Sequence, residues 1–194
     1  MPKGVTLPAV RGGCAGAIEK TAGHEHGHDV EVVAGDVTVR QARSDDVEFV
    51  QEMLYQAANR PGDEWPSLEE SLREPRNVRF WRDFGRAGDL GVIAERDGQP
   101  IGAAWIRFFH DDELSPIDDP GVAVLAIGVV ESERGRRVGS MLMSQLVERA
   151  RRAGVRAISL TTGRFNEAAL RLYEAHGFTK VLRHGDGVQM RLDL

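Results

Sequence analysis

Runs of alternating and helically spaced apolar residues predict the first elements of this chain. Val37 and Val39 alternate with polar residues and predict a short strand. Apolar residues then recur at helical spacing over 47–54, which predicts an amphipathic helix with Ser44 as its N-cap. Leucines and aromatic residues over 67–88, between breaking prolines and glycines, predict one or two further short helices.

Strand patterns dominate the middle of the sequence. Residues 90–96 and 100–109 read as two antiparallel strands, and Asp97 and Gly98 are turn residues that join them. The run GVAVLAIGVV, residues 121–130, is continuously apolar, as strands buried on both faces are. We therefore expect 121–130 to be the central strand of a sheet.

Helices and strands alternate over the rest of the chain. Apolar residues at helical spacing over 141–150 predict a helix that ends at Gly154. The elements that follow are a strand over 156–162, a helix over 166–177 and two strands over 178–184 and 188–194. This order predicts an α/β fold with a mixed, mostly antiparallel central sheet flanked by helices.

Charge and composition limit the functions that fit. The 194 residues include 25 basic and 30 acidic ones, a net charge of −5, which does not suit a general nucleic-acid binder. The longest apolar run, 121–130, is far shorter than the roughly 20 residues of a membrane-spanning helix. The single cysteine, Cys14, excludes an intrachain disulfide and fits a reducing compartment. We expect a cytoplasmic protein with no nucleic-acid or membrane partner.

The N-terminal segment differs from the rest. Residues 1–36 are rich in glycine and alanine and lack periodicity, which predicts a flexible tail before one domain over 37–194. Within this tail, His24, His26 and His28 would share one side of an extended chain and could coordinate a metal. No cysteine or second ligand pair supports that reading, so we expect no metal requirement.

The stretch ESERGRRVGS, residues 131–140, joins the central strand to the next helix. A helix N-terminus exposes unpaired N–H groups, and Gly135 and Gly139 let backbone approach a phosphate closely. Alone, the stretch fits a pyrophosphate site and an ordinary basic connection equally well. It lacks the Gly-Lys-Ser/Thr of a nucleotide P-loop and the three glycines of the dinucleotide fingerprint.

A second informative stretch is NEAALRLYEAHGF, residues 166–178. Asn166 is placed to cap a helix that Gly177 ends. Tyr173 lies on that helix, and in isolation the pattern favours a half-buried core aromatic there.

Together, in this order and at this distance, the two stretches resemble the GNAT superfamily of acyl-CoA-dependent N-acetyltransferases. The first family motif, Gln/Arg-x-x-Gly-x-Gly/Ala after a core strand, is RGRRVG at 134–139. The later motif, Asn-x-x-Ala-x-x-Leu-Tyr-x-x-x-Gly-Phe, is matched in full at 166–178. The resemblance covers about residues 37–194, including the predicted element order.

This resemblance implies a binding mode for acetyl-CoA. The central strands would splay apart, and the pantetheine arm would lie in the gap with an N–H of the central strand near the thioester oxygen. Backbone N–H groups of 135–140 would hold the pyrophosphate, and Tyr173 would protonate the leaving thiolate. The cofactor-binding residues that the resemblance implies are Ile127, Gly128, Val129, Arg134, Gly135, Arg136, Arg137, Val138, Gly139, Ser140 and Asn166.

Two positions depart from the family pattern. Arg137 occupies the place of the middle glycine, and we expect it to keep a negative φ on the first turn of the helix and to point outward. Thr161 stands where some members carry a glutamate, so the general base must lie elsewhere. The candidate bases are the carboxylates of Asp111, Asp112, Glu113, Asp118, Asp119, Glu131 and Glu133.

The resemblance therefore implies an N-acetyltransferase in which a primary amine attacks acetyl-CoA directly and Tyr173 is the general acid. The acceptor is left open among small polyamine-like or amino-sugar metabolites, amino acids and peptide amines, and we allow for a homodimer. Alternatives are a non-catalytic acyl-CoA-binding module and a metal-responsive protein that uses the histidine tract. The aromatic residues expected to shape the acceptor pocket are Trp65, Phe80, Trp81 and Phe84.

Overall fold

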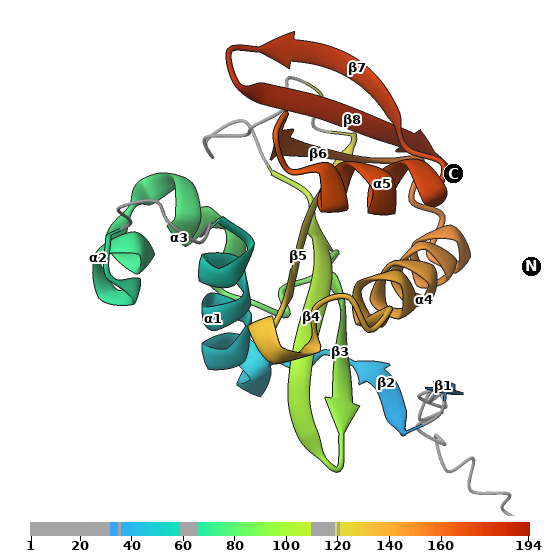
Figure 1. Ribbon diagram of the computed structural model, residues 1–194. Coiled ribbons are helices and arrows are strands. Elements are labelled where there is room, and N and C mark those ends of the chain that lie inside the picture. The colour runs from blue at the N-terminus through green and yellow to red at the C-terminus, as the bar shows by residue number, and fades with distance from the viewer. Residues whose placement is uncertain (1–31, 35, 59–65, 110–118, 120) are drawn as a thin grey trace, which may run out of the picture.

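A computed structural model describes residues 32–34, 36–58, 66–109, 119 and 121–194 (Figure 1). One sheet of eight strands has the order β1-β2-β3-β4-β5-β6-β8-β7. The strands are β1 (Val32–Ala34), β2 (Val37–Gln41), β3 (Leu90–Arg96), β4 (Gln99–Arg107), β5 (Ala123–Val129), β6 (Ala157–Gly163), β7 (Thr179–His184) and β8 (Gly187–Asp193). All neighbours pair antiparallel except β5 and β6, so the predicted mixed, mostly antiparallel sheet is confirmed.

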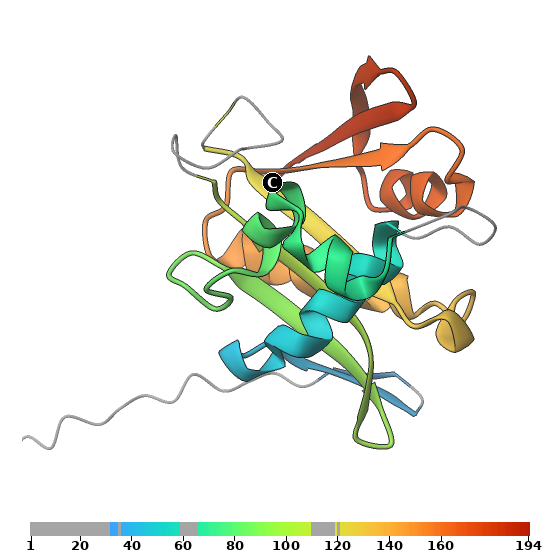
Figure 2. The same cartoon turned by 90° about the vertical axis from the view of Figure 1, so that its left-hand side faces the viewer.

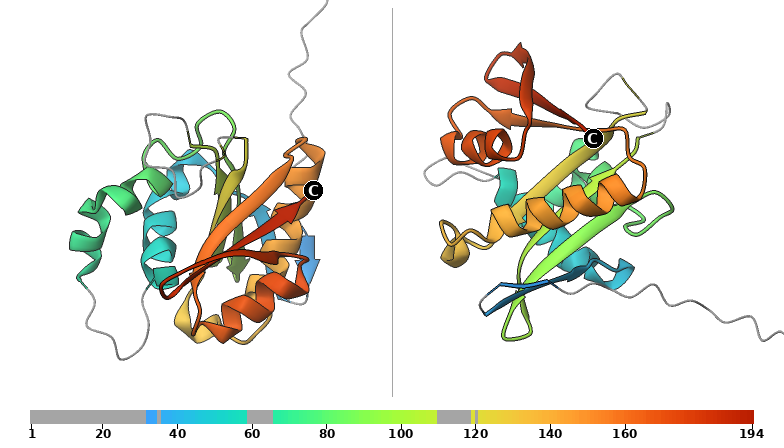
Figure 3. Two further views of the ribbon diagram at one scale, coloured as in Figure 1. Left: turned by 90° about the horizontal axis from the view of Figure 1, so that it is seen from above. Right: turned by 90° about the vertical axis from the view of Figure 1, so that its right-hand side faces the viewer.

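Helices cover both faces of the sheet. The α-helices are α1 (Val47–Ala58), α2 (Leu68–Arg73), α3 (Pro75–Trp81), α4 (Val138–Arg152) and α5 (Glu167–Ala175), and two short 3-10 helices are η1 (Ser44–Asp46) and η2 (Glu131–Glu133). Helices α1 to α3 lie on one face (Figure 2), and α4 crosses the other (Figure 3). Each face buries its own apolar cluster. Met53 of α1 and Trp105 of β4 are fully buried on one face, and Leu142 and Leu146 of α4 are fully buried on the other.

The hairpin between β3 and β4 follows from its turn residues. Asp97 and Gly98 have φ values of 51° and 73°, which is the left-handed geometry of the tight turns that suit the twist of two antiparallel strands. A long hairpin in the middle of the sheet results, and it carries β4 alongside β5 from Gly102 opposite Val129 to Arg107 opposite Val124.

Strands β5 and β6 form the predicted splay. Among the described residues, their parallel pairing consists of Ala123 with Ile158 and Val124 with Ser159, at the start of both strands. Beyond these pairs β5 stays with β4 and β6 stays with β8, so the two halves of the sheet diverge (Figure 1). The edge of β5 that faces β6 is therefore left open over its last residues.

Glycine lets α1 pack directly on β5. A Cβ atom built on Gly128 would lie 2.2 Å from the carbonyl oxygen of Met53, so no side chain fits between the helix backbone and the strand. Because Gly128 has no side chain, the backbone of α1 packs directly against β5.

Arg107 is a buried structural residue that the sequence did not reveal. Its side chain is fully buried, and its guanidinium donates to both carboxylate oxygens of Asp89 at 3.0 and 2.5 Å. It also donates to the carbonyl oxygens of Arg79, Arg82 and Asp83 at 2.7–3.2 Å. These bonds fasten the end of α3 and the following loop to β4.

Two sequence expectations change here. The sheet begins earlier than expected, because residues 32–34 of the predicted tail form β1 on the edge of β2, while residues 1–31 lie outside the described part. Ser44 is not the N-cap of α1: the chain enters through η1, and the carboxylate of Asp46 accepts a bond of 2.7 Å from the backbone N–H of Arg43. This bond is the reverse arm of a capping box, in which the side chain of the third helical residue accepts the N–H of the N-cap residue Arg43.

Candidate cofactor and active site

The open edge of β5 presents backbone groups to the gap. Val130 donates its N–H to the carbonyl oxygen of Ile101 on β4. Because peptide groups alternate in direction along a strand, Gly128 also faces β4, whereas Ile127 and Val129 point their N–H and C=O groups toward β6. Of the three predicted pantetheine partners, Ile127 and Val129 thus have the right direction, and Gly128 contributes the close approach of α1 instead.

Arg134 closes the end of this edge. Its guanidinium donates to the carbonyl oxygen of Val129 at 3.2 Å and to the backbone and side-chain oxygens of Gln56, both at 3.1 Å. The first residue of the predicted phosphate motif therefore ties the loop after β5 to α1. Its side chain holds the loop in place, and the bonds extend away from the first turn of α4.

Arg137 adopts a backbone conformation that corrects our expectation. It is the N-cap of α4 with φ 66° and ψ 5°, in the left-handed region, and not a residue of the first helical turn with negative φ. The turn from η2 into α4 requires this geometry at the glycine position of the motif, and Gly135 is left-handed as well, with φ 75°. The side chain of Arg137 is exposed, as expected.

The first turn of α4 leaves its N–H groups available. The first intrahelical bond from this end runs from Met141 N–H to the Arg137 carbonyl, so the N–H groups of Val138, Gly139 and Ser140 precede it. Arg137 makes no side-chain cap, and this turn, which the structure describes completely, contains no acidic residue. The positive end of the helix dipole is thus uncompensated by the chain itself.

The second half of helix α5 lies beside this turn. A Cβ atom on Gly139 would lie 3.4 Å from Cδ2 of Leu172, and the hydroxyl oxygen of Ser140 lies 3.0 Å from Nε2 of His176. Asn166 caps α5 by accepting the N–H of Ala169 through its side-chain oxygen at 3.2 Å. The structure therefore brings the two motifs together, although the sequence separates them by a helix and a strand.

Tyr173 lies on the buried side of α5. It is 8% exposed, and its ring packs against Phe178 with centroids 5.9 Å apart. Burial raises the pKa of Tyr173 to about 12, because the phenolate would lose its hydration. The phenol is consequently protonated at neutral pH, as a proton donor must be.

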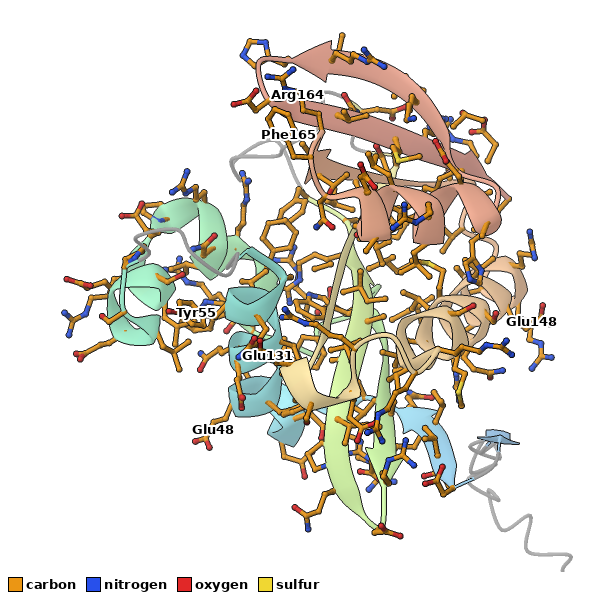
Figure 4. The ribbon with its side chains drawn as sticks, viewed as in Figure 1. Glu48, Tyr55, Glu131, Glu148, Arg164 and Phe165 are labelled. Carbon is orange, nitrogen blue, oxygen red and sulfur yellow. The ribbon has the colours of Figure 1, made fainter. Side chains whose placement is uncertain are left out.

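The candidate bases separate into two groups. Glu133 is engaged by Arg96 at 3.0 Å, and Asp119 lies between Arg156 and Arg191 at 3.2 and 3.7 Å. Glu131 is exposed at the start of η2 (Figure 4). The remaining loop candidates, Asp111, Asp112, Glu113 and Asp118, lie outside the described residues.

The predicted acceptor aromatics are not all available to a ligand. Phe84 is buried and meets Trp105 edge-on at 6.3 Å, so it belongs to the core under α1. Phe80 packs edge-on against Phe109 at 5.5 Å. Phe165 was not among the predicted aromatics; it is 63% exposed after the end of β6, next to Asn166 (Figure 4). Trp65 lies outside the described residues.

Two negative findings concern the described residues alone. They contain no cluster of three or more His, Cys, Asp or Glu side chains arranged to hold a metal ion. No helix among them is long and apolar enough to cross a bilayer. The tract of His24, His26 and His28 lies outside this part of the chain.

The sequence is similar to known acetyltransferases. The family model for the acetyltransferase (GNAT) family matches residues 52–178. Mycothiol acetyltransferase from Sanguibacter keddieii is 38% identical over 101 residues, which are 52% of this chain and 30% of that protein. Mycothiol acetyltransferase from Brachybacterium faecium is 33% identical over 124 residues, which are 64% and 33%. The chain thus spans about a third of the length of these relatives.

Solved structures share the fold at low identity. The GNAT domain of PAT from S. lividans superposes with a TM-score of 0.63 at 21% identity, covering 84% of this chain and 96% of that one. The paia N-acetyltransferase from Thermoplasma acidophilum, solved in complex with coenzyme A, gives a TM-score of 0.62 at 16% identity, covering 81% and 99%. Because the family model matches more than half of this chain, the chain belongs to the acetyltransferase (GNAT) family.

Proposed function

We propose that this chain is an N-acetyltransferase that moves an acetyl group from acetyl-CoA to a primary amine. The observation that carries the proposal is the first turn of α4, which leaves its N–H groups and dipole uncompensated beside the open edge of β5. A helix end of this kind suits a diphosphate, and an open strand edge suits the amides of pantetheine. Solved relatives of the same fold carry acetyl-CoA or coenzyme A.

In this proposal, each residue around the gap between β5 and β6 has a role in binding acetyl-CoA. The diphosphate bonds the N–H groups of Val138, Gly139 and Ser140, and Arg136 and Arg137 add positive charge nearby. The pantetheine amides pair with the backbone N–H and C=O of Ile127. Because Arg134 already bonds the Val129 carbonyl, the N–H of Val129 is the group left to meet the thioester oxygen. Asn166 keeps its amide NH₂ for the cofactor arm while its oxygen caps α5.

The reaction proceeds by direct attack. The lone pair of the neutral amine forms a bond to the thioester carbon, and the resulting oxyanion accepts a hydrogen bond from the strand N–H. The C–S bond then breaks, the thiolate takes the phenolic proton of Tyr173, and the amine nitrogen releases its proton to a carboxylate or to water. A thiol has a pKa of about 8.5, so a phenol with a pKa of about 12 transfers its proton only as negative charge builds on the sulfur.

Replacing Tyr173 with Phe tests this assignment. Acetylation of the best amine found by screening a library for thiol release should slow by at least about a hundredfold, because one positioned proton donor is lost. Tyr55→Phe is the matched control, since the chain has two tyrosines and the Tyr55 hydroxyl bonds the Pro66 carbonyl. Binding of CoA should persist in both variants. Full turnover in Tyr173→Phe would remove that residue from the mechanism.

A non-catalytic acyl-CoA-binding module is the alternative. It would bind CoA through the same gap and release no thiol with any amine. The motif tyrosine that the enzyme would use as its acid, Tyr173, is present and favours the enzyme. The amine screen on the unmodified chain decides between the two.

A further inference from the structure

One side-chain pair at the junction of α4 and α5 has no part in the proposed mechanism. The hydroxyl oxygen of Ser140 and Nε2 of His176 lie 3.0 Å apart, although the residues are 36 positions apart in sequence. Ser140 is the third residue of α4, and His176 is the C-cap of α5. Both side chains are partly buried, so the bond has a defined geometry instead of competing with bulk water.

The position of Ser140 gives this bond a chemical meaning. Its backbone N–H belongs to the uncapped first turn of α4, and its hydroxyl is attached one residue after Gly139, where α4 approaches Leu172 of α5. A hydroxyl carries one proton and can donate to one partner only. If that proton goes to His176, the oxygen presents lone pairs to an approaching anion; if His176 donates, the proton is free for the anion.

A neutral His176 permits either arrangement, and an anion beside Ser140 selects the second, because the hydroxyl can bond an anion only by donating its proton to it. Burial lowers the pKa of His176 below its ordinary value near 6.5, so the imidazole is neutral at pH 7 and carries one N–H. A neutral imidazole can place that proton on Nε2, where it donates to the serine oxygen. Ser140 would then be held as a donor while its oxygen lone pair is occupied.

We propose that His176 is a positioning residue for acetyl-CoA. Its Nε2–H donates to the hydroxyl oxygen of Ser140 and thereby directs the Ser140 hydroxyl proton to a diphosphate oxygen of the cofactor. The inference rests on the proposed function, because it takes the diphosphate to lie at the first turn of α4. It adds to the N–H groups of that turn a side-chain donor whose orientation is set by the neighbouring helix.

The test is a double-mutant cycle read by calorimetric titration with CoA. His176→Leu keeps a side chain of similar bulk and removes the donor, and Ser140→Ala removes the hydroxyl. Each should weaken CoA binding by about three- to tenfold, the usual value of one such hydrogen bond. The double variant should be no weaker than either single one, because His176 acts through Ser140. His176→Gln, which can donate from its amide, should restore affinity to within about twofold.

A substrate without the diphosphate separates positioning from simple packing. With S-acetylpantetheine as acetyl donor, His176→Leu should have the kcat/KM of the unmodified chain, while with acetyl-CoA its KM should rise and its kcat stay unchanged. Equal losses with both donors, additive losses in the cycle, or an unchanged affinity for CoA in His176→Leu would overturn the inference. Failure of the unmodified chain to bind CoA would instead overturn the proposed function beneath it.

Discussion

The N-termini of α4 and α5 are built in opposite ways. Helix α5 begins with Asn166, whose side chain caps the N–H of Ala169, and its first turn carries the carboxylate of Glu167. Helix α4 begins with Arg137, which provides no side-chain cap, and its fully described first turn carries no acidic residue. One helix satisfies its own end, and the other leaves N–H groups and dipole unsatisfied.

This difference favours α4 as the helix that would receive the anion of the proposed cofactor. An uncapped helix end is a loss of stability unless a ligand occupies it, and a capped end has fewer donors to offer. The left-handed Arg137 supports the same conclusion, because a side chain accepts that strained backbone only where the turn geometry is required. The free N–H groups of a helix N-terminus would thus serve ligand binding in α4, whereas in α5 a side-chain cap on them stabilises the fold.

The largest effect should come from putting a negative charge on the first turn of α4. Ser140→Asp would supply the anion from the chain itself and repel the diphosphate. We expect the Kd for CoA to rise by at least about tenfold, since two charges near 4 Å interact by about 1 to 4 kcal/mol at or near a protein surface. Calorimetric titration with CoA measures this.

The matched control is the same charge on the other helix. Ala168→Asp adds a carboxylate to the exposed first turn of α5, which already carries Glu167. Its Kd for CoA should change by about twofold or less. Equal losses in the two variants would mean that the helices do not differ in the way described.

A smaller effect is expected on stability when the cap of α5 is removed. Asn166→Ala deletes the oxygen that accepts from Ala169, and the free energy of unfolding should fall by about 1 kcal/mol. Chemical denaturation measures the change, with Arg137→Ala as the control, because Arg137 has no cap to lose. A larger loss in the arginine variant would reverse the comparison.

Relief of the strained turn should have a still smaller, favourable effect. A left-handed conformation costs a residue with a side chain about 1–2 kcal/mol, and glycine recovers part of that while losing more freedom on folding. Arg137→Gly should therefore raise the free energy of unfolding by about 0.5 kcal/mol relative to Arg137→Ala, as measured by denaturation. A lower stability of the glycine variant would show that the extra freedom glycine loses on folding outweighs the strain it relieves.

The smallest effect concerns the charge of Arg137. Its exposed guanidinium lies near the proposed diphosphate site but is screened by water and salt. Arg137→Ala should raise the KM for acetyl-CoA by about two- to threefold at low ionic strength and less in added salt. An unchanged KM at low salt would exclude a charge contribution from this side chain.

Hydrophobic patterning predicted most of the fold because it reflects burial. The apolar run of residues 121–130 became the central β5, and the order of helices and strands followed the periodicity of the sequence. β1 was missed because it is a three-residue edge strand with little pattern to detect. The burial of Arg107 was not predicted. Its partners, Asp89 and the carbonyl groups near 79–83, lie 18 or more residues away in sequence, so the local pattern shows only a strand residue.

The candidate site was predictable in its motifs and less so in its details. The motifs predicted a helix with Asn166 at its start and Tyr173 along it, as the structure has them. The predicted negative φ of Arg137 was wrong. Residues with a side chain prefer negative φ, but the turn into α4 overrides that preference. The bonds of Arg134 to Gln56 and of Ser140 to His176 connect distant segments, and local sequence carries no signal for such pairs.

The most direct test of the central claim is to follow backbone amide signals by NMR while CoA is added to the full chain. The account predicts that the amides of Val138, Gly139 and Ser140 shift strongly as they bond the diphosphate. The capped amide of Ala169 should move little in the same titration. Strong shifts at the first turn of α5 with none at the first turn of α4 would contradict the account.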